Sequence, residues 1–184
     1  MTVEQLEKIV AGAVSLVLAR ESADSAPSEP NPNLGSMALE AAGRVLRAAD
    51  AASRLDANPA EKWRRRILWV DDHPNNNIYE RQTFEALGFT FALASSTNEA
   101  LEKLRNSKFG AIISDMGRRE GPREGYRLLD TVRGFDSTTP YFFYTGSRAS
   151  EHIKEAITHG AQGGTNLPNE LIDMVVSTLE RKGR

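Results

Sequence analysis

Ile67-Leu68-Trp69-Val70-Asp71-Asp72 (ILWVDD) consists of four apolar residues followed directly by two acids. A short apolar run of this kind is typical of a strand that is buried on both faces of a parallel sheet. The two adjacent carboxylates repel each other, so the pair indicates a site for a positively charged partner. Four more strands are predicted after this one, at Thr90–Ala94, Phe109–Ser114, Pro140–Tyr144 and Ala161–Thr165.

Helical patterns separate these apolar runs. We predict helices at 75–87, 96–104, 123–132, 149–159 and 169–180, with Asn75, Asn76 and Asn77 capping and opening the first one. Gly88 and Gly160 stand where glycine commonly ends a helix. Five strand–helix units in succession predict an α/β fold, a doubly wound five-stranded parallel sheet with helices on both faces.

Polar residues end three of the predicted strands. Asp71 and Asp72 follow the first strand, Asp115 the third and Thr145 the fourth. Ligand sites of such sheets lie beyond the carboxyl ends of the strands, so we expect these four side chains to converge. Three carboxylates at one point favour a hard cation, and Mg²⁺ is commonly held by one or two carboxylates and water.

Residues 1–58 differ from the rest of the chain. We predict an α-helical N-terminal region there, with helices at 3–20 and 37–55 joined by a flexible, proline-rich linker at about 21–36; a separate domain then spans 64–184. The alanine-rich face of the second helix can pack on the following domain or on a second copy of the chain. We favour a homodimer formed through these helices.

Composition excludes several classes of function. The 184 residues carry a formal net charge of −2 and no cysteine, which excludes disulfides, thiolate zinc sites and cysteine nucleophiles. We interpret the basic run Trp63–Arg66 as a lead-in to the sheet, and we expect no nucleic-acid partner. The longest apolar stretch, Ile9–Ala19, is shorter than the roughly 20 residues of a membrane span. No basic segment precedes it as in a signal peptide, so we expect a cytoplasmic protein without a membrane partner.

The segments WVDDHP (69–74), IISDMG (112–117), YFFYTGS (141–147) and HGAQGGTNLP (159–168) resemble the receiver domain of bacterial two-component response regulators, which has a flavodoxin-like fold. The resemblance covers about 66–182. It implies that Asp115 accepts a phosphoryl group, that Asp71 and Asp72 hold Mg²⁺ together with the backbone carbonyl of Gly117, and that the Thr145 hydroxyl follows the phosphoryl group. The implied function is a phosphorelay receiver that takes its phosphoryl group from a histidine kinase or another phosphodonor and acts through protein–protein association.

Two positions depart from the family pattern. Leu167 stands where the family has a lysine before the proline, and Gly164 stands where it has a switch aromatic residue. A pseudo-receiver, which keeps the fold as an interaction module without phosphorylation, is therefore an alternative. The long segment Met116–Gly125 also brings three arginines near the site in sequence, Arg118, Arg119 and Arg123. One of them could replace the lysine, or the segment could be a solvated loop.

A small hydrolase on the same architecture is the third alternative. Phosphatases with an aspartyl nucleophile need a second acid two residues beyond it, and Gly117 takes that place after Asp115. A hydrolase acting on nucleotides would need a glutamate in the cleft, and no predicted strand end supplies one. We therefore predict that the protein is not an enzyme.

Overall fold

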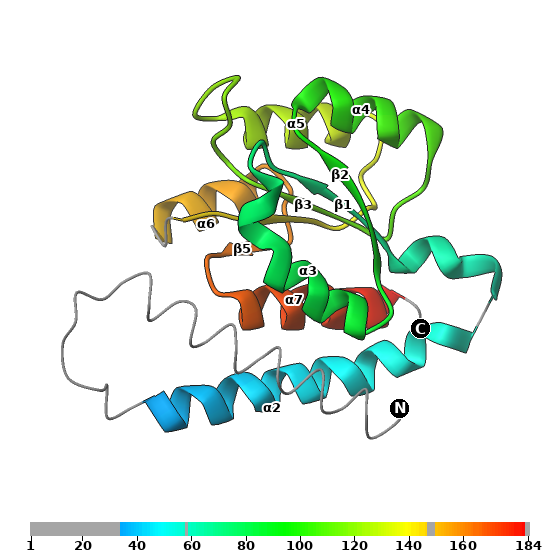
Figure 1. Ribbon diagram of the computed structural model, residues 1–184. Helices are drawn as coiled ribbons and strands as arrows, with labels where there is room; N and C mark the ends of the chain where they lie inside the picture. The colour runs from blue at the N-terminus through cyan, green and yellow to red at the C-terminus, as the bar shows by residue number, and fades with distance from the viewer. Residues whose placement is uncertain (1–33, 58, 147–149, 183–184) are drawn as a thin grey trace.

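The computed structural model describes residues 34–57, 59–146 and 150–182. Within them, a five-stranded parallel sheet has the order β2-β1-β3-β4-β5. This order and the surrounding helices confirm the doubly wound prediction (Figure 1). The helix predicted at 3–20 and most of the predicted linker lie outside the described residues. The strands are β1 (Arg66–Val70), β2 (Thr90–Ala94), β3 (Ala111–Ser114), β4 (Tyr141–Tyr144) and β5 (Gly163–Thr165).

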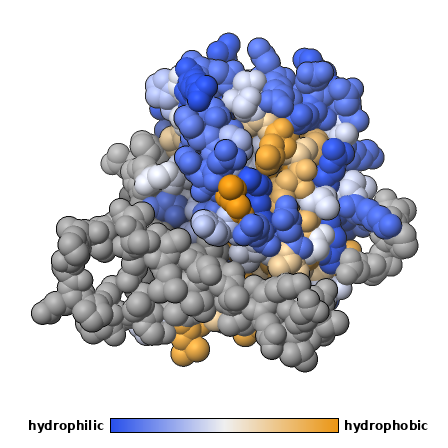
Figure 2. Space-filling model, viewed as in Figure 1, coloured by the Kyte–Doolittle hydropathy of each residue, from blue (hydrophilic) through white to orange (hydrophobic). Residues whose placement is uncertain are grey.

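Helices cover both faces of the sheet. Helices α3 (Ile78–Ala86) and α7 (Pro168–Lys182) pack on one face, while α4 (Thr97–Asn106), α5 (Glu124–Arg133) and α6 (Ser150–Thr158) pack on the other (Figure 1). Side chains alternate between the two faces along each strand, so Phe142 joins the core under α3 and α7 whereas Phe143 joins the opposite core. Among the described residues, no helix combines the length and hydropathy that crossing a bilayer requires. On the face that Figure 2 shows, the surface over α4 is mainly hydrophilic.

Local signals in the sequence match several helix ends. The hydroxyl of Ser96 accepts a hydrogen bond from the Glu99 N–H at 3.2 Å and so caps α4. The Glu99 carboxylate in turn accepts from the N–H of Ser95 at 2.8 Å. Gly88 and Gly160, with φ of +86° and +92°, follow α3 and α6 in the left-handed conformation that glycine adopts without strain. These ends fix where the following strands begin.

Helix α2 (Leu34–Ser53) packs along α7 as an additional layer below the sheet (Figure 1). Its buried face consists of small residues and Val45, which allows close approach to α7, whereas Leu39 on another side is 76% exposed. The alanine-rich face is therefore covered within this chain, one of the two packing modes considered above. Pairing of N-terminal helices between two chains stays a prediction. Two short 3₁₀ segments, Arg54–Ala57 and Pro59–Arg65, lead from α2 into β1.

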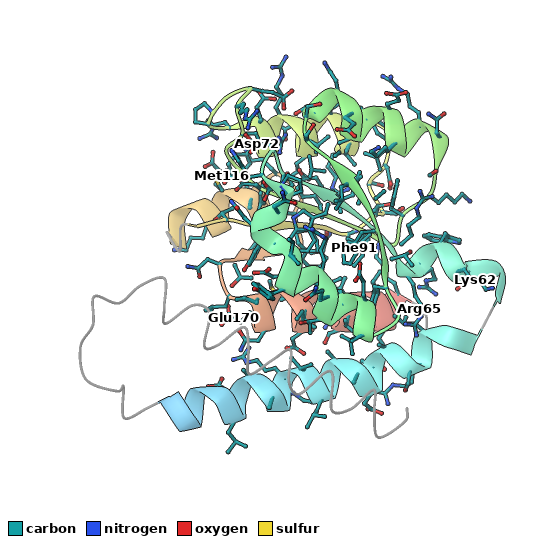
Figure 3. The ribbon with its side chains drawn as sticks, viewed as in Figure 1. Lys62, Arg65, Asp72, Phe91, Met116 and Glu170 are labelled. Atoms are coloured by element: carbon teal, nitrogen blue, oxygen red, sulfur yellow. The ribbon has the colours of Figure 1, made fainter. Side chains whose placement is uncertain are left out.

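Two arginines fasten α2 to the α/β unit. The Arg65 guanidinium donates to the carbonyl oxygens of Ala52 at 2.5 Å and Leu87 at 2.6 Å, which ties the end of α2 to the end of α3. Arg54 pairs with Glu180 of α7 at 2.7 Å. Figure 3 places Arg65 far from the edge of the molecule where Asp72 lies. The basic run before β1 thus makes structural contacts, as predicted for a lead-in to the sheet.

Candidate functional site

A polar cavity of about 440 Å³ opens at the carboxyl ends of the central strands. It contains three of the predicted site residues, Asp71, Asp115 and Thr145, which are up to 74 positions apart in the chain. The structure therefore brings together side chains from the ends of β1, β3 and β4. The remaining lining residues are His73, Asn76, Asn77, Glu80, Tyr144, Gly146 and Asn166.

Backbone hydrogen bonds hold these strand ends in place. The N–H of Asp71 donates to the Ala94 carbonyl at 2.9 Å, and the N–H of Asp115 donates to the Val70 carbonyl at 2.9 Å. The N–H of Thr145 likewise donates to the Thr165 carbonyl at 3.1 Å. The sheet ladder thus continues to the first residue of the site on each strand, so the positions of these three side chains are set by the rigid core.

Asp115 has the most perturbed acid–base behaviour in the cavity. Burial raises its pKa to about 6, and the negative charges of Asp71 and Asp72 act in the same direction. The N–H of Met116, which donates to Oδ1 at 2.7 Å, and the nearby Arg118 oppose this rise. Figure 3 shows Asp72 and Met116 near each other at this edge of the molecule. A positive charge placed among these acids would stabilise the ionised form of Asp115.

The acidic pair makes two different sets of contacts. Asp71 accepts hydrogen bonds from the His73 N–H at 2.6 Å and from the Asn77 side-chain amide at 2.5 Å. Asp72 points instead toward the following loop, where its Oδ2 accepts from the Arg119 N–H at 3.0 Å. Partial burial would raise the pKa of Asp72, but this N–H and the His73 ring outweigh burial and hold the pKa below its usual value.

Asn77 corrects one prediction. It occupies the position just before α3, but its side chain makes no capping hydrogen bond. Its amide nitrogen donates instead to the Asp71 carboxylate, a charge-assisted hydrogen bond that is stronger than the neutral bond a capping side-chain oxygen would accept from a backbone N–H. Asn77 is therefore a site residue rather than a helix cap.

The donor atoms fit a hard divalent cation. Ligand atoms of Asp71, Asp72 and His73 all lie within 4.8 Å of one another, and Asp115 faces the same cavity as Asp71 without belonging to that compact group. Carboxylate oxygens suit Mg²⁺, and its remaining positions are usually filled by water. Burial is the main cause of the raised pKa of Asp115, and the charges of Asp71 and Asp72 add to it; a cation here would offset both effects. The role of the Gly117 carbonyl as a further ligand stays a prediction.

Sequence reasoning missed the inner wall of the cavity. Glu80 of α3 is 8% exposed, burial raises its pKa, and it accepts a hydrogen bond from the Tyr144 hydroxyl at 2.8 Å. Tyr144 also contacts Trp69 edge-on, with ring centroids 5.9 Å apart. A glutamate does enter the cleft, but from a helix, where strand-end reasoning could not find it. Its only sequence signal is an acid one helical turn after Asn76 and Asn77.

The three loop arginines occupy three different environments. Arg118 is buried, and its guanidinium donates to Ser114 Oγ at 2.9 Å, to the Asp115 carbonyl at 2.9 Å and to Thr97 Oγ1 at 2.7 Å. Arg119 forms an ion pair with Asp72, with 3.6 Å between Nε of Arg119 and Oδ2 of Asp72. Arg123 pairs with Glu155 of α6. Contacts of these arginines thus hold the segment against the rest of the domain, so it is not simply a solvated loop. Of the three arginines, only Arg119 contacts the acidic pair.

The fifth strand lacks the family's two switch residues, as the sequence indicated. A Cβ added at Gly164 would lie 3.1 Å from the Phe143 Cβ, so a side chain there would require a shift of its neighbour. The N–H of Leu167 donates to Thr165 Oγ1 at 3.0 Å, and the preceding Asn166 lines the cavity. This wall of the site therefore presents the side-chain amide of Asn166, next to the position where the family has a lysine and this chain has Leu167.

Comparisons with known proteins agree with this architecture. Residues 67–174 match the family model of the response regulator receiver domain. The transcriptional regulatory protein ZraR of Escherichia coli K12 is 27% identical over 115 residues, which cover 62% of this chain and 25% of ZraR. The aligned part thus spans about a quarter of that curated relative.

Solved receiver structures share the fold. The chemotaxis response regulator CheY4 of Vibrio cholerae is 26% identical, with a TM-score of 0.51, and the match covers 63% of this chain and 96% of CheY4. A CheY-like receiver domain of Methanospirillum hungatei is 24% identical with a TM-score of 0.56, covering 65% and 98% of the two chains. The beryllofluoride-activated NtrC4 receiver domain dimer is 20% identical with a TM-score of 0.57, covering 65% and 99%. Because the family model matches more than half of this chain, the chain belongs to the response regulator receiver domain family.

Proposed function

We propose that this receiver accepts a phosphoryl group on Asp115, with Mg²⁺ held by Asp71 and Asp72, and signals through altered protein association. One observation carries the proposal: Asp115, Asp71 and Thr145 meet in one cavity at the ends of three adjacent strands. Membership of a signalling family supports it. The donor would be a histidine kinase or another phosphodonor protein, as the family resemblance implies.

The chemistry follows from the arrangement around Asp115. The Met116 N–H holds Oδ1, which leaves Oδ2 to attack the phosphorus of the donor. The new Oδ2–P bond forms as the bond from phosphorus to the leaving group breaks, and the leaving group departs with the electron pair. Mg²⁺ bound here would neutralise the charge on the transferring group. Thr145 lines the same cavity and would donate its hydroxyl to a phosphoryl oxygen.

Beryllofluoride, which mimics an acyl phosphate, tests the proposal on the full chain. Trp69 is buried and touches Tyr144, the neighbour of Thr145, so its fluorescence reports on the site; Trp63→Phe removes the exposed second tryptophan. We expect a Mg²⁺-dependent fluorescence change that Asp115→Asn abolishes. Asp136→Asn, in the loop between α5 and β4, is the control and should leave the fluorescence response intact. The absence of any response in the parent protein would contradict the proposal.

A pseudo-receiver is the second candidate, and the fifth strand favours it. Gly164 is closely packed against Phe143, and Leu167 rather than a lysine stands directly before Pro168, so two parts of the family's switch are missing. Incubation with acetyl phosphate and Mg²⁺ separates the two candidates. A hydroxylamine-labile phosphoryl group on Asp115 supports the first candidate, while metal binding without phosphorylation supports the second.

The hydrolase alternative gains no support from the cavity. Glu80 is already hydrogen-bonded to Tyr144, and the family is a signalling one. The proposed output is instead association, with residues 1–58 as the candidate effector region and a homodimer as its simplest form. Light scattering of the full chain with and without beryllofluoride tests this. An unchanged mass across a wide range of protein concentration would contradict a phosphorylation-driven dimer.

A further inference from the structure

The loop after β3 is held down at two points beside the acidic pair. Arg118 is 6% exposed, and its hydrogen bonds to Ser114 of β3 and Thr97 at the start of α4 anchor the loop. Backbone hydrogen bonds in both directions between Arg118 and Gly121, at 3.0 and 2.8 Å, close a tight turn. Glu120 extends the anchor by accepting from the Thr97 N–H at 3.0 Å. The backbone position of Arg119, at the tip of the turn, is therefore fixed by its neighbours, while its side chain is exposed.

Arg119 directs both its backbone and its side chain at one carboxylate. Its N–H donates to Asp72 Oδ2 at 3.0 Å, and its Nε lies 3.6 Å from the same oxygen. Its Nη2 lies 3.4 Å from Nε2 of His73, and the Nδ1 atom of the same ring lies 3.2 Å from Oδ1 of Asp72. Asp72 is thus surrounded by donors from the loop and from His73, whereas Asp71 faces the open cavity.

A divalent cation bound through Asp72 Oδ2 would occupy the oxygen that Arg119 contacts. Two cations cannot share Asp72 without repelling each other, and the guanidinium is 75% exposed, so it can leave at little cost. We propose that Arg119 competes with Mg²⁺ for Asp72 and thereby sets the Mg²⁺ concentration at which the site loads. This inference rests on the proposed function, since it concerns the metal used in that reaction.

The same geometry distinguishes Arg119 from its neighbours. Arg118 is buried beneath the site and cannot leave without disrupting the loop, and Arg123 is held by Glu155 on α6. Of the three loop arginines, Arg119 alone combines contact with Asp72 and a side chain that is free to move into solvent. Substituting it should preserve the fold, because its side chain is 75% exposed and contributes nothing to the hydrophobic core.

Isothermal titration of the full chain with MgCl₂ at low ionic strength tests the inference. We expect Arg119→Ala to lower the Kd for Mg²⁺ about fivefold, and Arg119→Glu to lower it further, because a competing charge is removed and then inverted. Arg119→Lys keeps the charge and should stay within about twofold of the parent. Arg123→Ala, in the same loop but bound to α6, is the control and should leave the Kd unchanged. The effect of Arg119→Ala should shrink at high salt, since the pair is exposed to solvent.

The outcomes separate this inference from the proposal beneath it. Equal Kd values for the parent, Arg119→Ala and Arg119→Glu would overturn the competition while leaving a functional metal site. Mg²⁺ binding with the expected order of Kd values, but no beryllofluoride response, would overturn phosphorylation and leave the competition standing. No Mg²⁺ binding in any of the proteins would overturn both.

Discussion

Val45→Ala tests whether α2 belongs to the core of this receiver. Val45 is fully buried in the cluster that joins α2 to α7. The substitution removes two methyl-sized groups, each worth about 0.8 kcal/mol of transfer free energy, and a cavity term adds roughly 1 kcal/mol. Alanine is a better helix former than valine by about 0.5 kcal/mol, which offsets part of the loss. We expect a net destabilisation of about 2 kcal/mol.

Urea unfolding followed by circular dichroism measures this loss. With an m-value of about 2 kcal/mol/M, the midpoint should fall by about 1 M. Leu39→Ala is the matched control on the same helix, because Leu39 is 76% exposed and its loss should change stability by less than about 0.5 kcal/mol. The shift for Val45 should not depend on protein concentration, since α7 of the same chain covers it. Equal stability of the two variants, or a shift that varies with concentration, would refute the intramolecular packing of α2.

The remaining predictions concern single residues, each read out by urea unfolding. Arg65→Ala should cost about 3 kcal/mol, because two backbone carbonyls at helix ends lose a charged donor; a loss below about 1 kcal/mol would contradict this. Burial raises the pKa of Glu80, so the contribution of Glu80 to stability should fall as pH rises above about 4, and Glu80→Gln should gain stability relative to the parent over that range. Partial burial opposes but does not outweigh the hydrogen bonds from Thr138 and Thr139 that lower the pKa of Asp136 to about 2. Discounted for solvent screening, this shift is worth roughly 1.5 kcal/mol of stability, which should be lost as pH falls from about 4 toward 2 and should not contribute to the pH dependence of Asp136→Asn. Gly110→Ala should cost more than about 3 kcal/mol, since its Cβ would lie 1.8 Å from a backbone oxygen, whereas Gly43→Ala, inside α2 with its nearest neighbour 3.6 Å away, should gain about 0.5–1 kcal/mol.

The sequence by itself determined the sheet and the main site. Apolar runs and helical periodicity are local properties, so β1 to β5 and their helices could be located within a few residues. Parallel strands end at a common edge, so the sequence alone places Asp71, Asp115 and Thr145 together. The same reasoning identified Leu167 and Gly164 as departures from the family.

Tertiary structure alone decided the contacts that depend on how elements rotate and where loops run. Glu80 enters the cavity because α3 turns that face toward Tyr144, and Asn77 reaches Asp71 instead of capping its helix. Arg119 meets Asp72 across 47 residues of chain, and α2 covers α7 from the far end of the sequence. No local pattern encodes such pairings, since they arise only when packing of the whole core fixes the distance between segments remote in the chain.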